Sequence, residues 1–317
     1  MTDSIVWLNE PNATERHLGG KGGSLARLSG LGFPVPPGFV ISAEEYVSFA
    51  KTQRISELTA SLSELDARTP IAAIRTALEP ISERLVNATL DTSTRTAIEH
   101  AIDELESQAG PGASFAVRSS SINEDSAGSS FAGLYESFLN LQGKEAIVGA
   151  VVDCYRCLWQ ERAVQYRAFR AIDHEGEAMA VVVMQVVRAR SSGVAFTKNP
   201  MTGATDEVLI NASWGLGESV VSGYVTPDSF IVGPDKEVRE RTISEKYEQV
   251  RLAEGGTERA PIAPEMVGEP SLSDLEVDEI VQVARSVQQE YGAPVDIEFA
   301  YDDAGKMFLL QARPITT

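Results

Sequence analysis

The sequence predicts an α+β fold whose helices are concentrated in the first third of the chain. Helical periodicity runs through much of residues 42–105, and short apolar segments between glycine-rich loops begin at residue 115. A pair of segments that include alternating apolar and polar side chains closes the chain. Helical and strand periodicities that occupy separate regions are typical of α+β proteins.

The composition is that of a globular protein with no affinity for nucleic acid or membranes. The chain has 317 residues, 43% of them hydrophobic and 23% charged, enough for one large core or two subdomains. The formal net charge of −19 opposes binding to nucleic acid and anionic lipid, and no Lys/Arg run offsets it. The longest apolar stretches, such as residues 178–187, are too short to span a bilayer and lack the flanks of a signal peptide. We therefore expect a cytoplasmic protein.

The first third is predicted to be mainly helical. A short helix is expected at residues 22–29, and an extended segment at 33–41, where prolines restrict the backbone. Ser42 and Glu45 fit a capping box that would start the next helix. Further helices are predicted at residues 55–65, 71–85 and 94–105.

The remainder is predicted to combine strands with two longer helices. The helices are expected at residues 144–171 and 274–291. Strands are predicted at residues 115–119, 180–187, 193–197, 207–212 and 228–232. A hairpin of strands 295–301 and 307–313 around a turn at 302–305 completes the chain.

The two cysteines, Cys154 and Cys157, have the C-x-x-C spacing of redox and metal motifs. They lie inside a helical pattern rather than at a helix N-terminus, and there is no second pair for zinc. We interpret them as structural thiols.

The final hairpin contains the first candidate site. Alternation places Asp296 and Glu298 on the face opposite Ile297. A tight turn would set Asp296 near Arg313 and Glu298 near Gln311. Carboxylate and amide oxygens suit Mg²⁺, which completes its shell with water and phosphate oxygens. A solvated sheet face with a cross-strand ion pair is the alternative.

A second candidate is Lys21, which stands among four glycines just before the helix predicted at residues 22–29. A glycine-rich turn lets backbone amides approach phosphate closely. The segment is not a Walker A loop, because Lys21 is followed by glycine and the upstream spacing is missing. The alternative is a flexible loop with a solvated lysine.

A third candidate is Arg118, which ends a strand before the small, polar loop at residues 119–133. A guanidinium in that place can hold phosphate bidentately while the loop closes over it. The alternative is a surface ion pair with Glu124 or Asp125. The glycines at residues 214–218 do not indicate a dinucleotide fold, because the third glycine of that fingerprint is absent.

Together these segments resemble the nucleotide-binding domain shared by phosphoenolpyruvate synthase, pyruvate phosphate dikinase and rifampicin phosphotransferase. The matching motifs occur in the family order at residues 19–22, 37–39, 115–120, 130–133, 193–197, 215–218, 296–298 and 311–314. The resemblance covers essentially the whole chain. It implies an ATP-grasp architecture of two subdomains that clamp Mg-ATP. The first would span residues 1–180, with the phosphate-covering loop at 119–133, and the second residues 181–317.

The resemblance also implies roles for individual residues. Three cations would contact the ATP phosphates and serve catalysis, namely Lys21, Arg118 and Arg313. Glu298 and Gln311 would hold Mg²⁺, with Asp296 nearby. The adenine hinge would offer groups from Gln185 and Val187, and the closing loop would cover Gly133 and Ser137.

In that family a phosphoryl group passes from ATP to a histidine on a separate swivelling domain, leaving AMP and phosphate, and then to an acceptor. Here His17, His100 and His174 all lie outside the family's carrier motif. We therefore expect the carrier histidine on another polypeptide or region, and an acceptor of the pyruvate, antibiotic or phenol type. The alternatives are a self-contained small-molecule kinase and a non-catalytic ATP-binding module.

Overall fold

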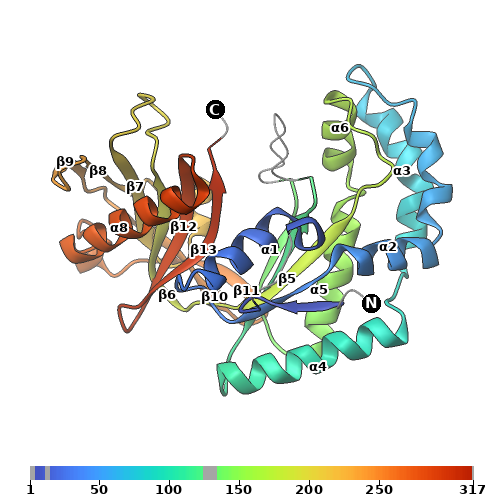
Figure 1. Cartoon of the computed structure of the whole chain (residues 1–317), viewed down its shortest axis with the longest axis horizontal. Coiled ribbons are helices and arrows are strands. Elements are labelled where there is room, and N and C mark those ends of the chain that lie inside the picture. The colour runs from blue at the N-terminus through green and yellow to red at the C-terminus, as the bar shows by residue number, and fades with distance from the viewer. Residues whose placement is uncertain (1–3, 11–14, 124–133, 316–317) are drawn as a thin grey trace. The chain divides into compact units, whose positions relative to one another are not determined.

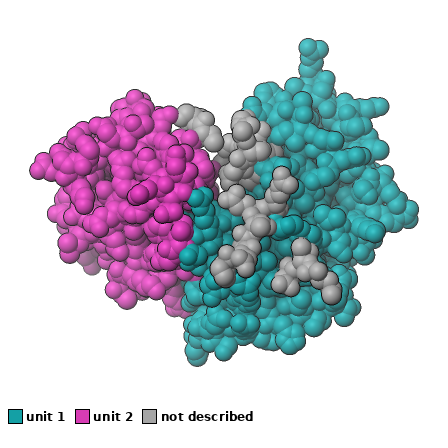
Figure 2. Space-filling view, viewed as in Figure 1, with its two compact units in different colours: residues 1–30, 37–186 teal, residues 31–36, 187–317 magenta. Residues whose placement is uncertain are grey.

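The computed structural model describes residues 4–10, 15–123 and 134–315, and it divides the chain into two compact units (Figure 1, Figure 2). Unit 1 comprises residues 1–30 and 37–186, and unit 2 comprises residues 31–36 and 187–317. The chain passes from unit 1 to unit 2 just after strand β5 (Met179–Gln185), whereas the sequence-based division lies within that strand. The predicted mixture of helix and sheet is confirmed.

Unit 1 is built on a five-stranded antiparallel sheet in the order β1-β2-β5-β3-β4. Its other strands are β1 (Ile5–Trp7), β2 (Gly38–Ile41), β3 (Phe115–Ser121) and β4 (Ser137–Leu141). On the central strand β5, Val181, Val182 and Val183 are fully buried although their side chains alternate between faces. Both faces of the sheet are therefore covered at its centre.

Helices provide that cover. They are α1 (Glu15–Gly30), α2 (Ala43–Thr52), α3 (Ile71–Val86), α4 (Thr92–Ala109), α5 (Lys144–Cys157) and α6 (Glu161–Phe169). α1 contacts β2, β3 and β5, and α5 contacts β3, β4 and β5. Because α1 contacts β3 directly, it brings the start of the chain to the strand that carries Arg118.

Two predicted helices differ in the structure. Residues 55–65 form two short 3-10 segments, η1 (Ile55–Glu57) and η2 (Thr59–Leu62), because serine and threonine hydroxyls there bond to nearby backbone carbonyls. The helix predicted at residues 144–171 is divided into α5 and α6. At the division Trp159 is buried, and its indole N–H donates to the hydroxyl of Tyr46 in α2 at 2.9 Å.

The predicted capping box at Ser42 is wrong. Ser42 occupies the N-cap position of α2, but its hydroxyl has no partner among the described residues. The Glu45 carboxylate instead accepts a hydrogen bond from Thr94 Oγ1 at 2.6 Å. A capping box forms at Ser273 and Glu276, where α8 (Asp274–Tyr291) begins.

Unit 2 contains a six-stranded antiparallel sheet in the order β13-β12-β6-β7-β8-β9. Its strands are β6 (Ala189–Phe196), β7 (Val208–Trp214), β8 (Asp228–Val232), β9 (Val238–Thr242), β12 (Val295–Asp302) and β13 (Met307–Pro314). Smaller elements are α7 (Glu218–Val221), η3 (Pro264–Met266) and the hairpin of β10 (Glu248–Ala253) with β11 (Gly256–Pro261). α8 contacts β12, β6 and β7.

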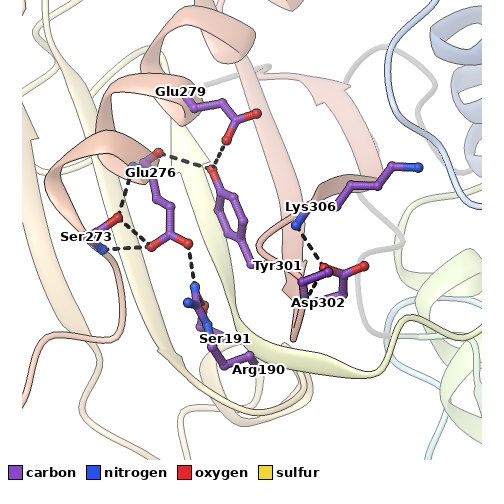
Figure 3. Close-up of polar contacts among 9 residues, drawn as sticks. Arg190, Ser191, Ser273, Glu276, Glu279, Tyr301, Asp302 and Lys306 are labelled. Carbon is purple, nitrogen blue, oxygen red and sulfur yellow. Dashed lines mark hydrogen bonds and ion pairs between the residues drawn. The ribbon is translucent and has the colours of Figure 1, made fainter.

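Polar contacts at the N-terminal turn of α8 fasten this helix to the sheet (Figure 3). The Tyr301 hydroxyl, on β12, lies 2.9 Å from Glu279 Oε2 and 3.2 Å from the carbonyl oxygen of Glu276. Arg190 donates to Glu276 Oε1 at 2.5 Å. Burial and the bond to Glu279 raise the pKa of Tyr301, so the phenol stays protonated. The strand that carries Asp296 and Glu298 is thereby held against α8.

The cysteines are buried free thiols, as expected. Burial raises the pKa of Cys157 to about 11 and that of Cys154 well above its ordinary value, which disfavours the reactive thiolate. Among the described residues, no helix combines the length and apolar character needed to cross a membrane.

Candidate functional site

The residues predicted to bind ATP and Mg²⁺ fall into two groups. The group in unit 1 consists of Lys21, Arg118, Ser137 and Gln185. The group in unit 2 consists of Val187, Asp296, Glu298, Gln311 and Arg313. Gly133, with residues 124–132 of the predicted loop, lies outside the described residues.

The glycine-rich segment around Lys21 belongs to α1, so the predicted helix begins earlier than expected. α1 is interrupted at Gly19, whose φ of 67° and ψ of 178° are not helical. A Cβ at this position would lie 2.1 Å from the backbone carbonyl oxygen of Ser120, so the close approach requires glycine. The interruption sets the direction of the chain just before Lys21.

Lys21 reaches the end of strand β3. Its Nζ donates to the carbonyl oxygen of Ser119 at 3.2 Å, a contact between residues 98 positions apart in sequence. Ser119 directly follows Arg118. The structure therefore brings two of the predicted phosphate-binding cations to the same stretch of one strand.

Arg118 shares a face of the sheet with Ser137. Arg118 lies opposite Ser137 of β4 and Val182 of β5, and directly opposed residues of antiparallel strands point to the same face. Ser120, two residues further along β3, lies on this face too and contacts α1. Arg118 is half-buried and Ser137 is exposed. We call Lys21 and Arg118 the cation cluster, and Ser137 lies opposite Arg118 on the neighbouring strand.

The predicted adenine hinge lies where β5 ends. The backbone N–H of Gln185 donates to the carbonyl oxygen of Pro37 at 2.9 Å. The backbone N–H of Val186 donates to the carbonyl oxygen of Ser114 at 2.8 Å. These two N–H groups hold the end of β5 in the sheet. Gln185 and Val187 are both half-buried.

The predicted register of the final hairpin is confirmed. Asp296 pairs with Arg313 and Glu298 pairs with Gln311, and a β-bulge follows between Glu298 and Phe299. Ile297, on the opposite face, is fully buried. The four polar residues consequently share one face of β12 and β13, which we call the acid–amide face.

On this face Arg313 and Asp296 form an ion pair. Arg313 Nε lies 2.8 Å from Asp296 Oδ2 and 3.0 Å from Oδ1. The side chain of Asp296 is 15% exposed and that of Arg313 is 34% exposed, so the pair is partly shielded from water. This contact limits the orientations of the guanidinium.

Glu298 and Gln311 offer a carboxylate and an amide oxygen from opposed positions. Gln311 is 8% exposed and Glu298 is half-buried. Within the described ranges, no three His, Cys, Asp or Glu side chains gather as a metal site. A carboxylate and an amide oxygen nevertheless fit Mg²⁺, which usually takes one or two protein carboxylates together with water and phosphate oxygens.

Two polar residues near these groups were missed in the sequence. Ser120 contacts the interrupted helix α1, and no local pattern marks that contact because the partners are about a hundred residues apart. Asn211 of β7 pairs with Val194 of β6, which itself pairs with Glu298. Asn211 therefore lies on the same side of the sheet as the acid–amide face. Strand alternation could have identified Asn211 only if the order of the strands were known.

The family model described as the AMP/ATP-binding domain of pyruvate phosphate dikinase matches residues 15–317. The probable phosphoenolpyruvate synthase of Methanocaldococcus jannaschii is 38% identical over 318 residues, 99% of this chain and 27% of that protein. The phosphoenolpyruvate synthase of Pyrococcus furiosus is 34% identical, over 99% of this chain and 44% of its own length.

The prodigiosin synthesizing transferase PigC of Serratia marcescens is 38% identical, over 99% of this chain and 33% of that protein. This chain thus spans less than half the length of these relatives. D-alanyl-alanine synthetase A of Vibrio cholerae, a solved structure, is similar over 93% of this chain and 58% of its own, at 11% identity and a TM-score of 0.32. From the match over residues 15–317, the chain belongs to the family of pyruvate phosphate dikinase AMP/ATP-binding domains.

Proposed function

We propose that this chain holds Mg-ATP for transfer of a phosphoryl group to a histidine on another domain or polypeptide. With water as co-reactant, ATP and the histidine yield phosphohistidine, AMP and phosphate. The phosphohistidine then phosphorylates a small molecule of the pyruvate, antibiotic or phenol type. The observation that carries the proposal is the contact of Lys21 with β3 beside Arg118, in a chain of an ATP-binding family.

Phosphoryl transfer depends mainly on positioning and on neutralising charge, with little covalent help from the protein. The cation cluster supplies Lys21 and Arg118, and the acid–amide face supplies Arg313. In this proposal all three contact phosphate oxygens. The two bonds from Arg313 Nε to Asp296 give Asp296 the role of orienting that cation.

Magnesium would be held by Glu298 and Gln311. Their opposed positions in β12 and β13 and the oxygen chemistry of their side chains support this role. The bound ion would supply charge neutralisation at the phosphates. Within the ATP-grasp architecture that we propose, Gln185 and Val187 contact the base, and Ser137 lies near the phosphates.

His174 is poorly placed to accept a phosphoryl group. His174 is 5% exposed, and its Nδ1 accepts a hydrogen bond from Arg167 Nε at 3.1 Å. Burial, followed by the charge of Arg167, lowers the pKa of His174 to about 4. His17 contacts Glu44. The greater length of the relatives also supports a carrier histidine outside this chain.

Labelled ATP tests the proposed function. The purified chain alone is expected to bind Mg-ATP without acquiring stable label from either γ-labelled or β-labelled ATP. When a histidine domain from a phosphoenolpyruvate synthase is added, label is expected on that domain, and mass spectrometry should find AMP rather than ADP. Stable labelling of the chain alone, abolished by His17→Ala, would instead show a self-contained kinase. Binding without transfer in either mixture would show a non-catalytic module.

Replacing Glu298 tests the metal site. Glu298→Gln removes a charged oxygen ligand without changing side-chain volume, so we expect the Mg²⁺ concentration for half-maximal ATP binding to rise about tenfold. Titration calorimetry at several Mg²⁺ concentrations measures this. Asp296→Asn, the matched change two residues away, is expected to have a smaller effect because Asp296 acts through Arg313. An unchanged Mg²⁺ dependence in Glu298→Gln would remove Glu298 from the site.

A further inference from the structure

The interruption in helix α1 is bridged by a side chain from strand β3. In a continuous α-helix the N–H of Gly22 would donate to the carbonyl oxygen of Leu18. Here the Ser120 hydroxyl stands between the two groups: it accepts from the Gly22 N–H at 2.9 Å and donates to Leu18 O at 2.7 Å. Insertion of a polar group into the helical hydrogen-bond ladder is a recognised cause of helix kinks.

The same hydroxyl also caps the part of α1 that follows the interruption. Helices commonly begin after a serine, threonine or aspartate whose side chain accepts from the N–H of the second or third residue. Gly19 occupies that position in α1 and has no side chain. The Gly22 N–H, three residues later, is capped by Ser120 instead. The cap is therefore supplied from β3.

Helix α1 and strand β3 approach so closely at Gly19 that no side chain fits at this position. Ser120 is fully buried, and a Cβ at Gly19 would lie 2.5 Å from its Oγ as well as 2.1 Å from its carbonyl oxygen. Lys21 lies inside the bridged stretch, between Gly19 and Gly22, and its Nζ donates to Ser119 on the same strand. The position of Lys21 relative to β3 is consequently set at this contact.

We propose that Ser120 is a positioning residue for phosphate binding, which places Lys21 beside Arg118 by bridging the interrupted helix. The proposal rests on the proposed function, because it assumes that Lys21 and Arg118 contact ATP. Ser120 itself acts through the helix and needs no contact with the nucleotide. Its hydroxyl donates its proton to the carbonyl oxygen of Leu18 and accepts from the N–H of Gly22.

Ser119 provides a matched control for the loss of a hydroxyl, since Lys21 bonds to its backbone carbonyl oxygen, which Ser119→Ala leaves in place. It is the neighbouring residue on β3, its side chain points to the opposite face, it is 1% exposed, and its hydroxyl donates to Glu136 O at 2.7 Å. Ser119→Ala and Ser120→Ala thus each remove one buried hydroxyl from the same strand. Only Ser120→Ala removes the bridge to α1.

The experiment compares Mg-ATP dissociation constants and thermal melts of the two variants. Ser120→Ala is expected to raise the dissociation constant for Mg-ATP about tenfold, whereas the constant of Ser119→Ala should stay within about twofold of that of the unmodified chain. The two variants should lose similar amounts of melting temperature, since each loses one buried hydroxyl. If Ser120→Ala fails to fold, Ser120→Cys replaces it in the comparison. Its thiol has nearly the volume of the hydroxyl group but forms only weak hydrogen bonds. It should also bind Mg-ATP more weakly than Ser119→Ala.

Equal dissociation constants in the serine variants would overturn the proposal, since Ser120 would then be only a structural residue. Lys21→Ala, measured alongside, separates this failure from that of the proposed function. If Lys21→Ala weakens Mg-ATP binding and Ser120→Ala does not, the positioning role alone is wrong. If Lys21→Ala leaves binding unchanged, the proposed phosphate contact is wrong, and the positioning role with it.

Discussion

Replacing Lys21 with alanine is expected to slow phosphoryl transfer from ATP by about 100-fold or more, because the transition state loses a positioned cation. The unfolding free energy should change little. Lys21 is half-buried, and its Nζ donates to the carbonyl oxygen of Ser119. Formation of AMP in the presence of a histidine domain measures transfer, and a circular-dichroism melt measures folding.

Lys51, an exposed cation in the last turn of α2, is the control for the loss of one positive charge. Lys51→Ala is expected to leave both transfer and melting nearly unchanged. A parallel loss of folding and activity in Lys21→Ala would count against a phosphate contact. Arg313→Ala should follow the same pattern as Lys21→Ala, with an added small change in melting because Asp296 loses its partner.

The largest loss of stability is expected at a buried ion pair in unit 2. Lys246 Nζ lies 2.6 Å from Asp228 Oδ1, and both side chains are fully buried. The other carboxylate oxygen of Asp228 accepts from the backbone N–H and the hydroxyl of Ser271, each at 2.7 Å. Asp228 therefore joins the start of β8 to the segments on both sides of the β10–β11 hairpin.

Lys246→Met is expected to lower the free energy of unfolding by about 3–5 kcal/mol, because it leaves the Asp228 carboxylate buried without its counter-charge. Urea denaturation measures the change. Arg251→Met is the control, since the Arg251–Glu258 pair is a surface ion pair with side chains 61% and 47% exposed. Its removal should change stability little. Similar losses in both variants would contradict the importance assigned to burial.

Local patterns were sufficient to predict the acid–amide face. Alternation assigned Asp296 and Glu298 to one face, and the predicted hairpin placed the return strand beside that face. Both predicted pairs, with Arg313 and with Gln311, occur in the structure. The β-bulge between Glu298 and Phe299 lies between the turn and these pairs, and it shifts the register by one residue, so that Glu298 lies opposite Gln311 rather than Leu310.

Local patterns were insufficient where a side chain has competing partners. The hydroxyls of Thr59, Ser61 and Ser63 donate to backbone carbonyls three residues earlier and favour 3-10 turns over the predicted helix. Ser42 and Glu45 have the spacing of a capping box, but Glu45 bonds to Thr94. Ser273 and Glu276 have the same spacing and do form the box. The motif alone does not distinguish the two places.

The sequence by itself determined the mixed fold class, the family, and which residues carry candidate chemistry, because strand alternation and short motifs are properties of neighbouring residues. Tertiary structure decided where those residues meet. The contacts of Lys21 with Ser119, of Gly22 with Ser120 and of Asp228 with Ser271 join residues far apart in the chain. Such contacts depend on strand order and helix packing, which create burial and hydrogen-bond partners that no local sequence pattern specifies.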